Sequence, residues 1–557
     1  MSDQRLKIVI VGGVAAGASA ATRARRCNES AEIILLEKDE HVSFANCGLP
    51  YHIGGEIPER GKLLVATREL LERRFRLDVR PFHEAIRIDR TAKSVVVRDL
   101  KRNCETEISY DKLILSPGAS PLVPDMPGAN APGVFTLRNI ADMDRICSAT
   151  TSSVSRKAIV IGAGFIGLEM VEQLVRLGFQ VTLAELQPQV LPPMDPEMVV
   201  PLRDELTRHN VTLCAGDGIK QILVDAQGRA SGVELGSGRK IDGDLVILGL
   251  GVRPNVKLAV DAGLVTGQSG GIATNRFQQT SDPDIYAAGD ACEYLYGPTG
   301  GQMRVPLAGP ANRAGRLAGQ HAATGECFPM APVNGTAIVR VFDQTAGMTG
   351  LTAKAAARSG IPFRSVTVIA GQHAGYFPGA TPLTLKLLYD PSTGKVLGAQ
   401  AIGHDGIDKR IDVIATAMAF QATVRDLTGL DLSYAPPFGS AKDPIHQAAF
   451  IACNELDGLS SMLEAGADLS AYQVVDIRTA AEIQKAPLTG CDHPIHIPVD
   501  ELRMRLKELD ASLPTVVSCG VGIRGHVAES ILRQSGFSTV YNLSGGATLR
   551  RRAVGEF

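Results

Sequence analysis

The chain has 557 residues, a hydrophobic content of 45% and a formal net charge of -2. Its length exceeds what a single core organises and indicates roughly three or four domains. The balanced charge excludes a basic field that would attract nucleic acid or an anionic membrane surface. The ten cysteines show no CxxC and no zinc-type spacing, so we expect free thiols, no metal site and a reducing, cytoplasmic compartment.

The chain opens on a pattern of strand, glycine turn, helix and strand over residues 7–37. The turn, Gly12–Gly17 (GGVAAG), is a dinucleotide fingerprint with a valine where the middle glycine normally stands. Glu37 ends the next strand, where its carboxylate can accept hydrogen bonds from a ribose diol. The helix start near Ala15 would offer N–H groups to a pyrophosphate. A signal peptide is the alternative for the apolar run 8–21, and Glu37 favours the nucleotide site.

A single cysteine follows in the segment 43–51, SFANCGLPY. A second strand–turn–helix–strand unit spans residues 157–185, with a complete fingerprint at Gly162–Gly167 (GAGFIG). Two such units predict two separate dinucleotide sites. Glu185 ends the second unit, where a carboxylate accepts a 2′-hydroxyl and repels a 2′-phosphate, so we expect NADH rather than NADPH.

Three further buried strands, 111–119, 245–251 and 284–290, each end in a glycine turn. Asp290 closes the last of them, and we expect a helix to follow it. In a flavoprotein this aspartate would hold the ribityl chain, and a helix N-cap is the alternative reading.

Alternating strands begin near residue 334, and a helix is expected at about 409–422. The polar, Gly/Ala/Ser-rich stretch near 454–470 predicts a linker. A short α/β pattern starts at Val474 and contains the loop Cys519–Arg524 (CGVGIR). Successive N–H groups of a tight loop that opens a helix form an anion-binding nest, which lowers a thiol pKa and stabilises a persulfide. Arg524 can fix this loop or meet an anionic donor.

Residues 1 to about 450 resemble the pyridine nucleotide-disulfide oxidoreductases, in particular the branch of coenzyme A-disulfide reductases, NADH oxidases and peroxidases with one active cysteine. The segment 43–51 is specific to that branch. The resemblance implies FAD, NADH and coenzyme A, as substrate or bound molecule. Relatives with a cysteine pair carry the second cysteine five positions on, where this chain has His52. Cys47 would therefore cycle through a mixed disulfide, a persulfide or a sulfenic acid.

The resemblance also implies site residues. Tyr376 and Tyr434 match tyrosines that reach into the partner's active site in a homodimer, with packing tyrosines as the alternative. Ser19, Arg23 and Arg26 share a helix face that could hold coenzyme A phosphates, with a solvated basic face as the alternative. Ser43, Asn46, Arg74 and Arg76 complete the expected substrate contacts. The expected cofactor contacts are Gly12, Gly13, Ala16, Gly17, Glu37, Lys38, Asn46, Ser116, Pro117, Gly118, Gly162, Gly164, Phe165, Ile166, Gly167, Glu185, Gly251, Gly289, Asp290, Pro306 and Ala308.

From about residue 466 the chain resembles a single rhodanese domain, through Val475–Arg478 (VDIR), the Cys519 loop and Tyr541–Gly546 (YNLSGG). An inactive rhodanese-like copy is the alternative. The fold class expected is therefore α/β, with two Rossmann-like domains, an α+β dimerisation domain and a C-terminal rhodanese domain. The expected bounds are 1–118 with 275–330 for FAD, 119–274 for NAD(H), 331–453 for dimerisation, 454–465 for a linker and 466–557 for the rhodanese domain.

Together these features predict an NADH-driven, FAD-dependent reductase of persulfides and polysulfides, with coenzyme A persulfide favoured. Cys47 is the expected reducing thiol and Cys519 the carrier of sulfane sulfur. Coenzyme A-disulfide reduction is the nearest alternative, followed by NADH oxidase or peroxidase activity. A sulfur-relay or redox-sensing protein is the alternative from another class. The sequence leaves open whether the linker lets Cys519 swing or coenzyme A carries the sulfur.

Overall fold

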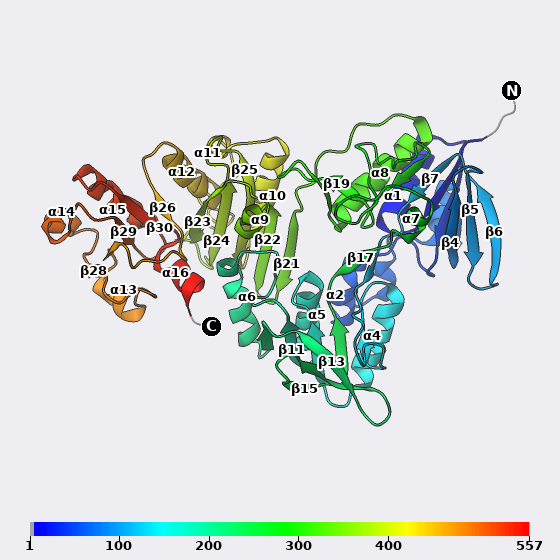
Figure 1. Ribbon diagram of the computed structural model, residues 1–557, viewed down its shortest axis with the longest axis horizontal. Helices are drawn as coiled ribbons and strands as arrows, with labels where there is room; N and C mark the ends of the chain where they lie inside the picture. Colours follow the sequence, from blue (N-terminus) through cyan, green and yellow to red (C-terminus); the bar gives the residue numbers. More distant parts are fainter. Residues whose placement is uncertain (1–4, 556–557) are drawn as a thin grey trace. The chain divides into compact units, whose positions relative to one another are not determined.

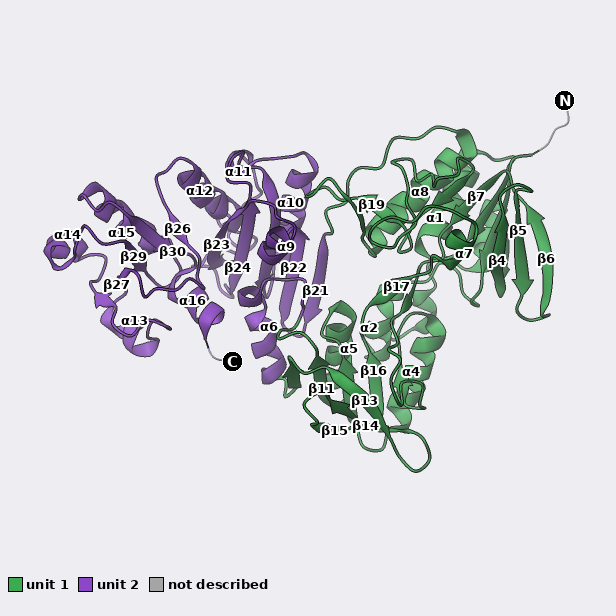
Figure 2. Ribbon diagram, viewed as in Figure 1, with its two compact units in different colours: residues 1–190, 209–335 green, residues 191–208, 336–557 purple. Residues whose placement is uncertain are grey.

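The computed structural model describes residues 5–555, which form two compact units (Figure 2). Unit 1 takes in the chain up to Val190 and His209–Gly335, and unit 2 takes in Leu191–Arg208 and the chain from Thr336 onward. Among the helices of residues 5–555, none has the length and apolar character that a membrane span requires.

The first sheet of unit 1 is parallel and has the order β18-β7-β1-β2-β3. Its strands are β1 (Lys7–Val11), β2 (Glu32–Glu37), β3 (Asp78–Pro81), β7 (Lys112–Leu115) and β18 (Ile285–Ala287). Helices α1 (Ala15–Cys27), α3 (Arg68–Phe75) and α8 (Ala308–Thr324) accompany it, with an antiparallel sheet of β4 (His83–Asp89), β5 (Ser94–Asp99) and β6 (Cys104–Ser109) beside it (Figure 1).

Helices α1 and α8 pack through small residues. A Cβ atom added at Gly315 or Gly319 of α8 would lie 2.1 or 2.2 Å from the carbonyl oxygen of Ala16 or Ala20 in α1. Only glycine permits this approach, because any side chain there would overlap the α1 backbone. The packing holds the helix that follows the first glycine turn in a fixed position.

The second sheet of unit 1, β12-β11-β10-β16-β9, repeats the parallel plan. Its strands are β9 (Val134–Phe135), β10 (Lys157–Ile161), β11 (Gln180–Glu185), β12 (Thr212–Ala215) and β16 (Leu245–Leu248), with α4 (Ile140–Ser152), α5 (Phe165–Arg176) and a three-stranded sheet of β13 (Ile219–Val224), β14 (Ala230–Leu235) and β15 (Lys240–Asp242). Short elements complete the unit: α2 (Leu49–Ile53), α7 (Lys257–Asp261), β8 (Ala119–Pro121), β17 (Val252–Pro254), β19 (Glu293–Leu295) and β20 (Gln302–Arg304).

Unit 2 begins with an antiparallel sheet, β21-β22-β25-β24-β23. The strands are β21 (Ala337–Val341), β22 (Gln344–Gly350), β23 (Arg364–Gly371), β24 (Pro382–Tyr389) and β25 (Val396–Gly403), and the helices are α6 (Pro196–Arg208), α9 (Ala353–Arg358), α10 (Ile407–Ala419), α11 (Val424–Thr428) and α12 (Pro444–Leu456). Apolar residues of β23, β24 and β25 form one buried core with α10 and α12.

The C-terminal part of unit 2 is a second parallel sheet, β26-β30-β29-β27-β28. Its strands are β26 (Met462–Leu463), β27 (Gln473–Asp476), β28 (Ile495–His496), β29 (Thr515–Ser518) and β30 (Val540–Leu543), with helices α13 (Ala480–Lys485), α14 (Leu502–Arg505), α15 (Ile523–Gln534) and α16 (Gly546–Val554). The expected fold class, mixed α/β with four such parts, is confirmed.

The segment predicted as a linker, 454–465, is instead built into its neighbours. It starts within α12, and β26 then joins the C-terminal sheet. Glu529 of α15 is 0% exposed and accepts hydrogen bonds from the Ser460 hydroxyl and the Ser461 N–H, the latter at 2.6 Å. The polar residues that suggested a linker are therefore hydrogen-bonded. A swinging Cys519 domain finds no support in this geometry.

Candidate active site

In both parallel sheets of unit 1, a backbone N–H of the glycine loop donates a hydrogen bond to the glutamate at the end of the next strand. The Gly13 N–H donates to Oε2 of Glu37, and the Ala163 N–H donates to Oε2 of Glu185, each at 2.7 Å. The N–H two residues beyond each glutamate donates to its Oε1, at 2.9 and 2.8 Å. Each carboxylate oxygen keeps a second lone pair for a ribose hydroxyl. Burial raises the pKa of Glu37, and its backbone hydrogen bonds oppose that shift.

In both loops, a nearby backbone carbonyl leaves no room for a side chain at the last glycine. A Cβ at Gly17 would lie 1.7 Å from the Gly12 carbonyl oxygen, and one at Gly167 would lie 1.9 Å from that of Gly162. A Cβ at Gly164, in contrast, would meet no protein atom within 4 Å. The second loop thus packs tightly against its helix and leaves open space over its middle glycine. A pyrophosphate at a helix N-terminus needs this combination, so the loop fits a dinucleotide.

The other expected cofactor residues lie in turns of unit 1. The Ser116 hydroxyl donates to the carbonyl oxygens of Val11 and Gly12, at 2.8 and 2.9 Å, and so ties the first loop to β7. Positive φ angles of 65°, 92° and 95° occur at Gly118, Gly251 and Gly289. Lys38 is exposed, Asn46 begins a short 3-10 turn, Pro306 precedes α8 by two residues, and Ala308 begins it. These residues remain predicted contacts.

Asp290 differs from the expectation in one respect. Strand β19 follows it, so the expected helix and the N-cap alternative are both wrong. Its carboxylate instead accepts a hydrogen bond from Nη2 of Arg138 at 3.0 Å. Arg138 was not found from the sequence, because no local motif joins two residues 152 positions apart.

Cys47 lies in the 3-10 turn Asn46–Gly48 and is exposed. The turn leads directly into α2, which packs on α5 of the second sheet. His52, at the position of a second redox cysteine in other family branches, directs Nδ1 to the Ile57 carbonyl oxygen at 2.6 Å. The His52 side chain thus has a structural partner, and the turn Asn46–Gly48 with α2 contains no second cysteine beside Cys47.

The charges around Cys47 disfavour its thiolate. Desolvation raises the pKa of the thiol, Glu169 and Asp290 add to the shift, and Arg138 opposes it. The Tyr51 hydroxyl donates to Glu169 at 3.0 Å and links α2 to α5. Glu169 and Arg138 are therefore two charged neighbours with opposite effects on the pKa of Cys47, and neither has a sequence motif.

The residues expected to bind coenzyme A are split between two environments. The Ser19 hydroxyl donates to Oδ1 of Asn312 at 2.6 Å, and Nη2 of Arg23 donates to Oε1 of Gln320 at 2.6 Å. Both partners belong to α8. Arg26 is exposed and lies over the Phe75 ring, 5.0 Å from its centroid. The three residues lie on α1 at the predicted spacing, and their side chains have protein partners on α8 and α3.

Three more expected substrate contacts are at the surface or in turns. Arg74 is exposed. Arg76 ends α3 in the left-handed conformation, with φ of 47°, and its carbonyl oxygen accepts a hydrogen bond from Arg25 at 3.0 Å. Ser43, with φ of 48°, precedes the Cys47 turn, and its N–H donates to the Gly13 carbonyl oxygen at 2.8 Å. Ser43 thus links the Cys47 segment to the first glycine loop.

Tyr376 and Tyr434 meet on the surface of unit 2. Their hydroxyl oxygens are 3.0 Å apart, and the residues are 76% and 48% exposed. The hydrogen bond to Tyr434 raises the pKa of Tyr376. Two exposed phenols joined by a hydrogen bond are poorly explained as packing residues, because the residues are 76% and 48% exposed.

Cys519 lies at the end of β29 and is 1% exposed. The Gly522 N–H donates to its Sγ at 3.0 Å, and Gly522 has a φ of 98°, which only glycine adopts readily. The Cys519 carbonyl oxygen accepts the Ala547 N–H at 2.8 Å, and a Cβ at Gly546 would lie 2.3 Å from that oxygen. The loop is thus clamped between the starts of α15 and α16 with an N–H group directed at the sulfur.

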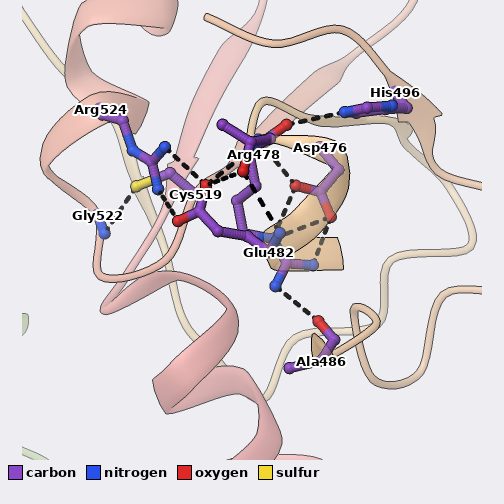
Figure 3. A network of polar contacts seen from close by, with 9 residues as sticks. Asp476, Arg478, Glu482, Ala486, His496, Cys519, Gly522 and Arg524 are labelled. Atoms are coloured by element: carbon purple, nitrogen blue, oxygen red, sulfur yellow. Dashed lines mark hydrogen bonds and ion pairs between the residues drawn. The ribbon is translucent and has the colours of Figure 1, made fainter. Parts of the chain in front are cut away.

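A polar network supports the Cys519 loop (Figure 3). Arg478 forms a buried ion pair with Asp476 at 2.6 Å, and the Arg478 carbonyl oxygen lies 2.8 Å from Nε2 of His496. Arg524, expected to fix the loop or meet a donor, forms an ion pair with Glu482 at 2.5 Å. Glu482 and His496 belong to no motif in the sequence and emerge only from the fold.

Comparison with known proteins decides the family. Residues 6–315 match the model of the pyridine nucleotide-disulphide oxidoreductases, residues 336–444 match the dimerisation domain of that family, and residues 456–549 match the rhodanese-like domain. The chain is a pyridine nucleotide-disulphide oxidoreductase. It is a flavoprotein enzyme whose cofactors are FAD and NADH, as the resemblance implies.

The relatives of this oxidoreductase match either most of the chain or nearly all of it. The coenzyme A disulfide reductase of Staphylococcus aureus strain JH9 is 36% identical over 444 residues, which make up 80% of this chain and 99% of that protein. The structure of reduced Bacillus anthracis CoADR-RHD has 43% identity and a TM-score of 0.94, covering 99% of this chain and 98% of that one. The NAD-dependent persulfide reductase from A. fulgidus has 34% identity and a TM-score of 0.90, covering 98% and 100%.

Proposed function

We propose that this oxidoreductase reduces persulfides and polysulfides with NADH, releasing hydrogen sulfide and a thiol, and that coenzyme A persulfide is its favoured substrate. The observation that carries the proposal is the Gly522 N–H directed at the buried sulfur of Cys519. A plain disulfide reductase needs no second thiol in an anion-stabilising loop, whereas a sulfane-sulfur carrier does. The persulfide reductase from A. fulgidus also matches along the C-terminal domain.

Cys47 is the proposed reducing thiol. Its thiolate attacks the inner sulfur of a persulfide RSSH, forms a mixed disulfide with RS, and releases HS⁻. Reopening this disulfide and releasing RSH requires two electrons, which NADH would supply through FAD when both are bound at the two glycine loops. The sum is RSSH, NADH and a proton giving RSH, hydrogen sulfide and NAD⁺. The loops closed by Glu37 and Glu185 are the proposed FAD and NADH sites, and the acid at Glu185 favours NADH over NADPH.

The substrate site is proposed to include Ser19, Arg23, Arg26, Ser43 and Asn46, with Arg74 or Arg76 as a further phosphate contact. Cationic side chains on and after α1 suit the phosphates of coenzyme A. Binding there would have to exchange the Arg23–Gln320 hydrogen bond for a phosphate contact.

A homodimer with shared active sites is part of the same proposal. The chain has a dimerisation domain, and the exposed pair Tyr376 and Tyr434 is the surface that we propose reaches the partner's Cys47. A phenol there could donate a proton to the leaving thiolate. We further propose a cytoplasmic location, where NADH is available; all ten cysteines, which lie within the described residues, are free.

The test is anaerobic NADH oxidation with sulfide detection, using coenzyme A persulfide, polysulfide and coenzyme A disulfide. Cys47→Ser is expected to lower kcat/KM for all three by at least about a thousandfold, because the attacking group is removed. Cys519→Ser is expected to lower polysulfide turnover by about tenfold, through loss of the positioned carrier, and to leave disulfide turnover unchanged.

The same assay separates the alternatives. Turnover of the disulfide alone, with Cys519→Ser silent, would identify a coenzyme A disulfide reductase, the function of the S. aureus relative. Fast NADH consumption only when oxygen is admitted would identify an oxidase, in line with the water-forming NADH oxidase from Lactobacillus brevis at 26% identity. Slow turnover with every small thiol would favour a sulfur-relay or redox-sensing protein.

A further inference from the structure

Arg524 of the Cys519 loop forms a bidentate ion pair with Glu482 of α13. Nη1 of Arg524 donates to Oε2 of Glu482 at 3.0 Å, and Nη2 donates to Oε1 at 2.5 Å, so both ends of the guanidinium fork are taken (Figure 3). The two side chains are 37% and 40% exposed. The pair therefore faces solvent at the entrance to a sulfur that is itself buried.

Glu482 is also fixed from its other side. It occupies the third position of α13, and its Oε2 accepts the N–H and the hydroxyl of Thr479, each at 2.9 Å, in a capping box. The hydrogen bond from Arg524 and the Thr479 N–H lower the pKa of Glu482 to about 2. The carboxylate is thus anionic at neutral pH and cannot turn away without uncapping α13.

Both charged groups lie against the residue next to the nucleophile. A Cβ at Gly520 would be 3.6 Å from Nη2 of Arg524 and 3.9 Å from Oε1 of Glu482. The hydrogen bond to Glu482 raises the pKa of Arg524, and the nearby Cys519 adds to that shift. The other nearby ions, Asp476 and Arg478, are buried and neutralise each other.

A guanidinium with a free fork would bind the sulfonate end of thiosulfate in a bidentate way. Here the fork is occupied, and a dianion that approached Cys519 would meet the carboxylate of Glu482. We propose that Glu482 sets the donor specificity of this domain, disfavouring thiosulfate and selecting neutral persulfides, RSSH. The inference rests on the proposed role of Cys519 as sulfur acceptor and adds the chemical class of its donor.

The transfer balances without an outside oxidant or reductant. The Cys519 thiolate attacks the outer sulfur of RSSH, an S–S bond forms at Cys519, the donor S–S bond breaks, and a thiolate RS⁻ leaves while the proton stays on the transferred sulfur. With thiosulfate the same attack would release sulfite and leave a persulfide anion on Cys519.

The test compares Glu482→Gln with the unchanged full-length protein. Glutamine keeps the size and can accept the Thr479 N–H, because capping boxes tolerate it, but it carries no charge to hold Arg524. The rate of persulfide formation at Cys519 is measured by mass spectrometry with thiosulfate and with 2-mercaptoethanol persulfide. Thiosulfate loading is expected to rise by about tenfold, since removal of a close like charge and release of a guanidinium act together. Loading from the alkyl persulfide should change less than about twofold, because its reacting form, RSSH, is neutral and gains little from either charge.

Glu508→Gln is the matched control, because Glu508 pairs with Arg505 at the surface of the same domain. Equal gains with both donors, or no gain with thiosulfate, would overturn the inference while leaving Cys519 as the acceptor. Failure of both donors to load Cys519 in the unchanged protein would overturn the proposed function itself.

The dependence of thiosulfate loading on salt concentration gives a second test that needs no variant. Thiosulfate loading of the unchanged protein should stay level or rise with ionic strength, because salt screens the repulsion by Glu482, and a steep fall with salt would show a free guanidinium and reject the inference.

Discussion

Cys47 and Cys519 differ in their exposure to solvent and in the groups that surround their sulfur atoms. Cys47 is exposed on a short turn, and desolvation, followed by the carboxylates of Glu169 and Asp290, raises the pKa of its thiol. Cys519 is 1% exposed, its sulfur accepts an N–H from Gly522, and Arg524 stands at its entrance. The protein therefore directs a hydrogen-bond donor at the Cys519 sulfur, whereas the surroundings of Cys47 disfavour its thiolate.

This difference indicates how each thiol obtains its reactivity. The Cys519 loop is held by backbone hydrogen bonds and by the ion pair between Arg524 and Glu482. The Cys47 turn is tied to the first glycine loop through Ser43 and to α5 through Tyr51, so its supports are the two proposed dinucleotide sites. We expect Cys47 to depend on cofactor binding and Cys519 to be independent of it.

Among the variants that test this comparison, Gly17→Ala comes first, because it changes the cofactor site and leaves the Cys519 loop untouched. A Cβ there would lie 1.7 Å from the Gly12 carbonyl oxygen. Retained flavin should fall by about tenfold or more, because overpacking costs roughly 1–3 kcal/mol. The flavin absorbance per chain measures this. Gly61→Ala is the control, since its Cβ would meet no atom within 4 Å. Normal persulfide loading of Cys519 in Gly17→Ala would support the comparison, and loss of loading would contradict it.

The second prediction concerns hydrogen exchange in the segment Ser460–Leu463, which precedes the Cys519 domain and is bound to it by Glu529. Glu529 is 0% exposed, accepts the Ser461 N–H, and pairs with Arg533 at 3.1 Å. In Glu529→Gln, hydrogen exchange at Ser460–Leu463 should accelerate by about ten- to a hundredfold, because a lost charged hydrogen bond costs about 1.5–3 kcal/mol. Glu508→Gln removes an exposed ion pair of the same domain and should change exchange little. Equal exchange in both variants would show that Glu529 does not anchor the segment.

Local motifs explain which parts of this arrangement the sequence predicts. The glycine loops, Glu37, Glu185 and both thiols stand in patterns of consecutive residues, and the fold class follows from repeated strand–turn–helix units. Arg138 with Asp290 and Glu482 with Arg524 join residues 152 and 42 positions apart, so no local pattern reveals them. The segment 454–465 looks like a linker because its serines are polar, and composition does not show that a buried glutamate binds them.

The smallest expected effect concerns the reactivity of Cys47. Arg138 is the charge that opposes the raised pKa of this thiol, and Glu169 is the leading charge that adds to it. Arg138→Gln should raise the pKa further and slow iodoacetamide labelling, because the thiolate reacts and its fraction falls tenfold per pKa unit below the pKa. Glu169→Gln should lower the pKa and speed labelling. Changes of about two- to fivefold are expected for partly exposed charges at this range. Peptide-resolved mass spectrometry against pH measures both rates, with Cys519 of the same chain as the internal reference. Changes of the same sign in the two variants, or equal changes at Cys519, would mean that these charges do not set the state of Cys47.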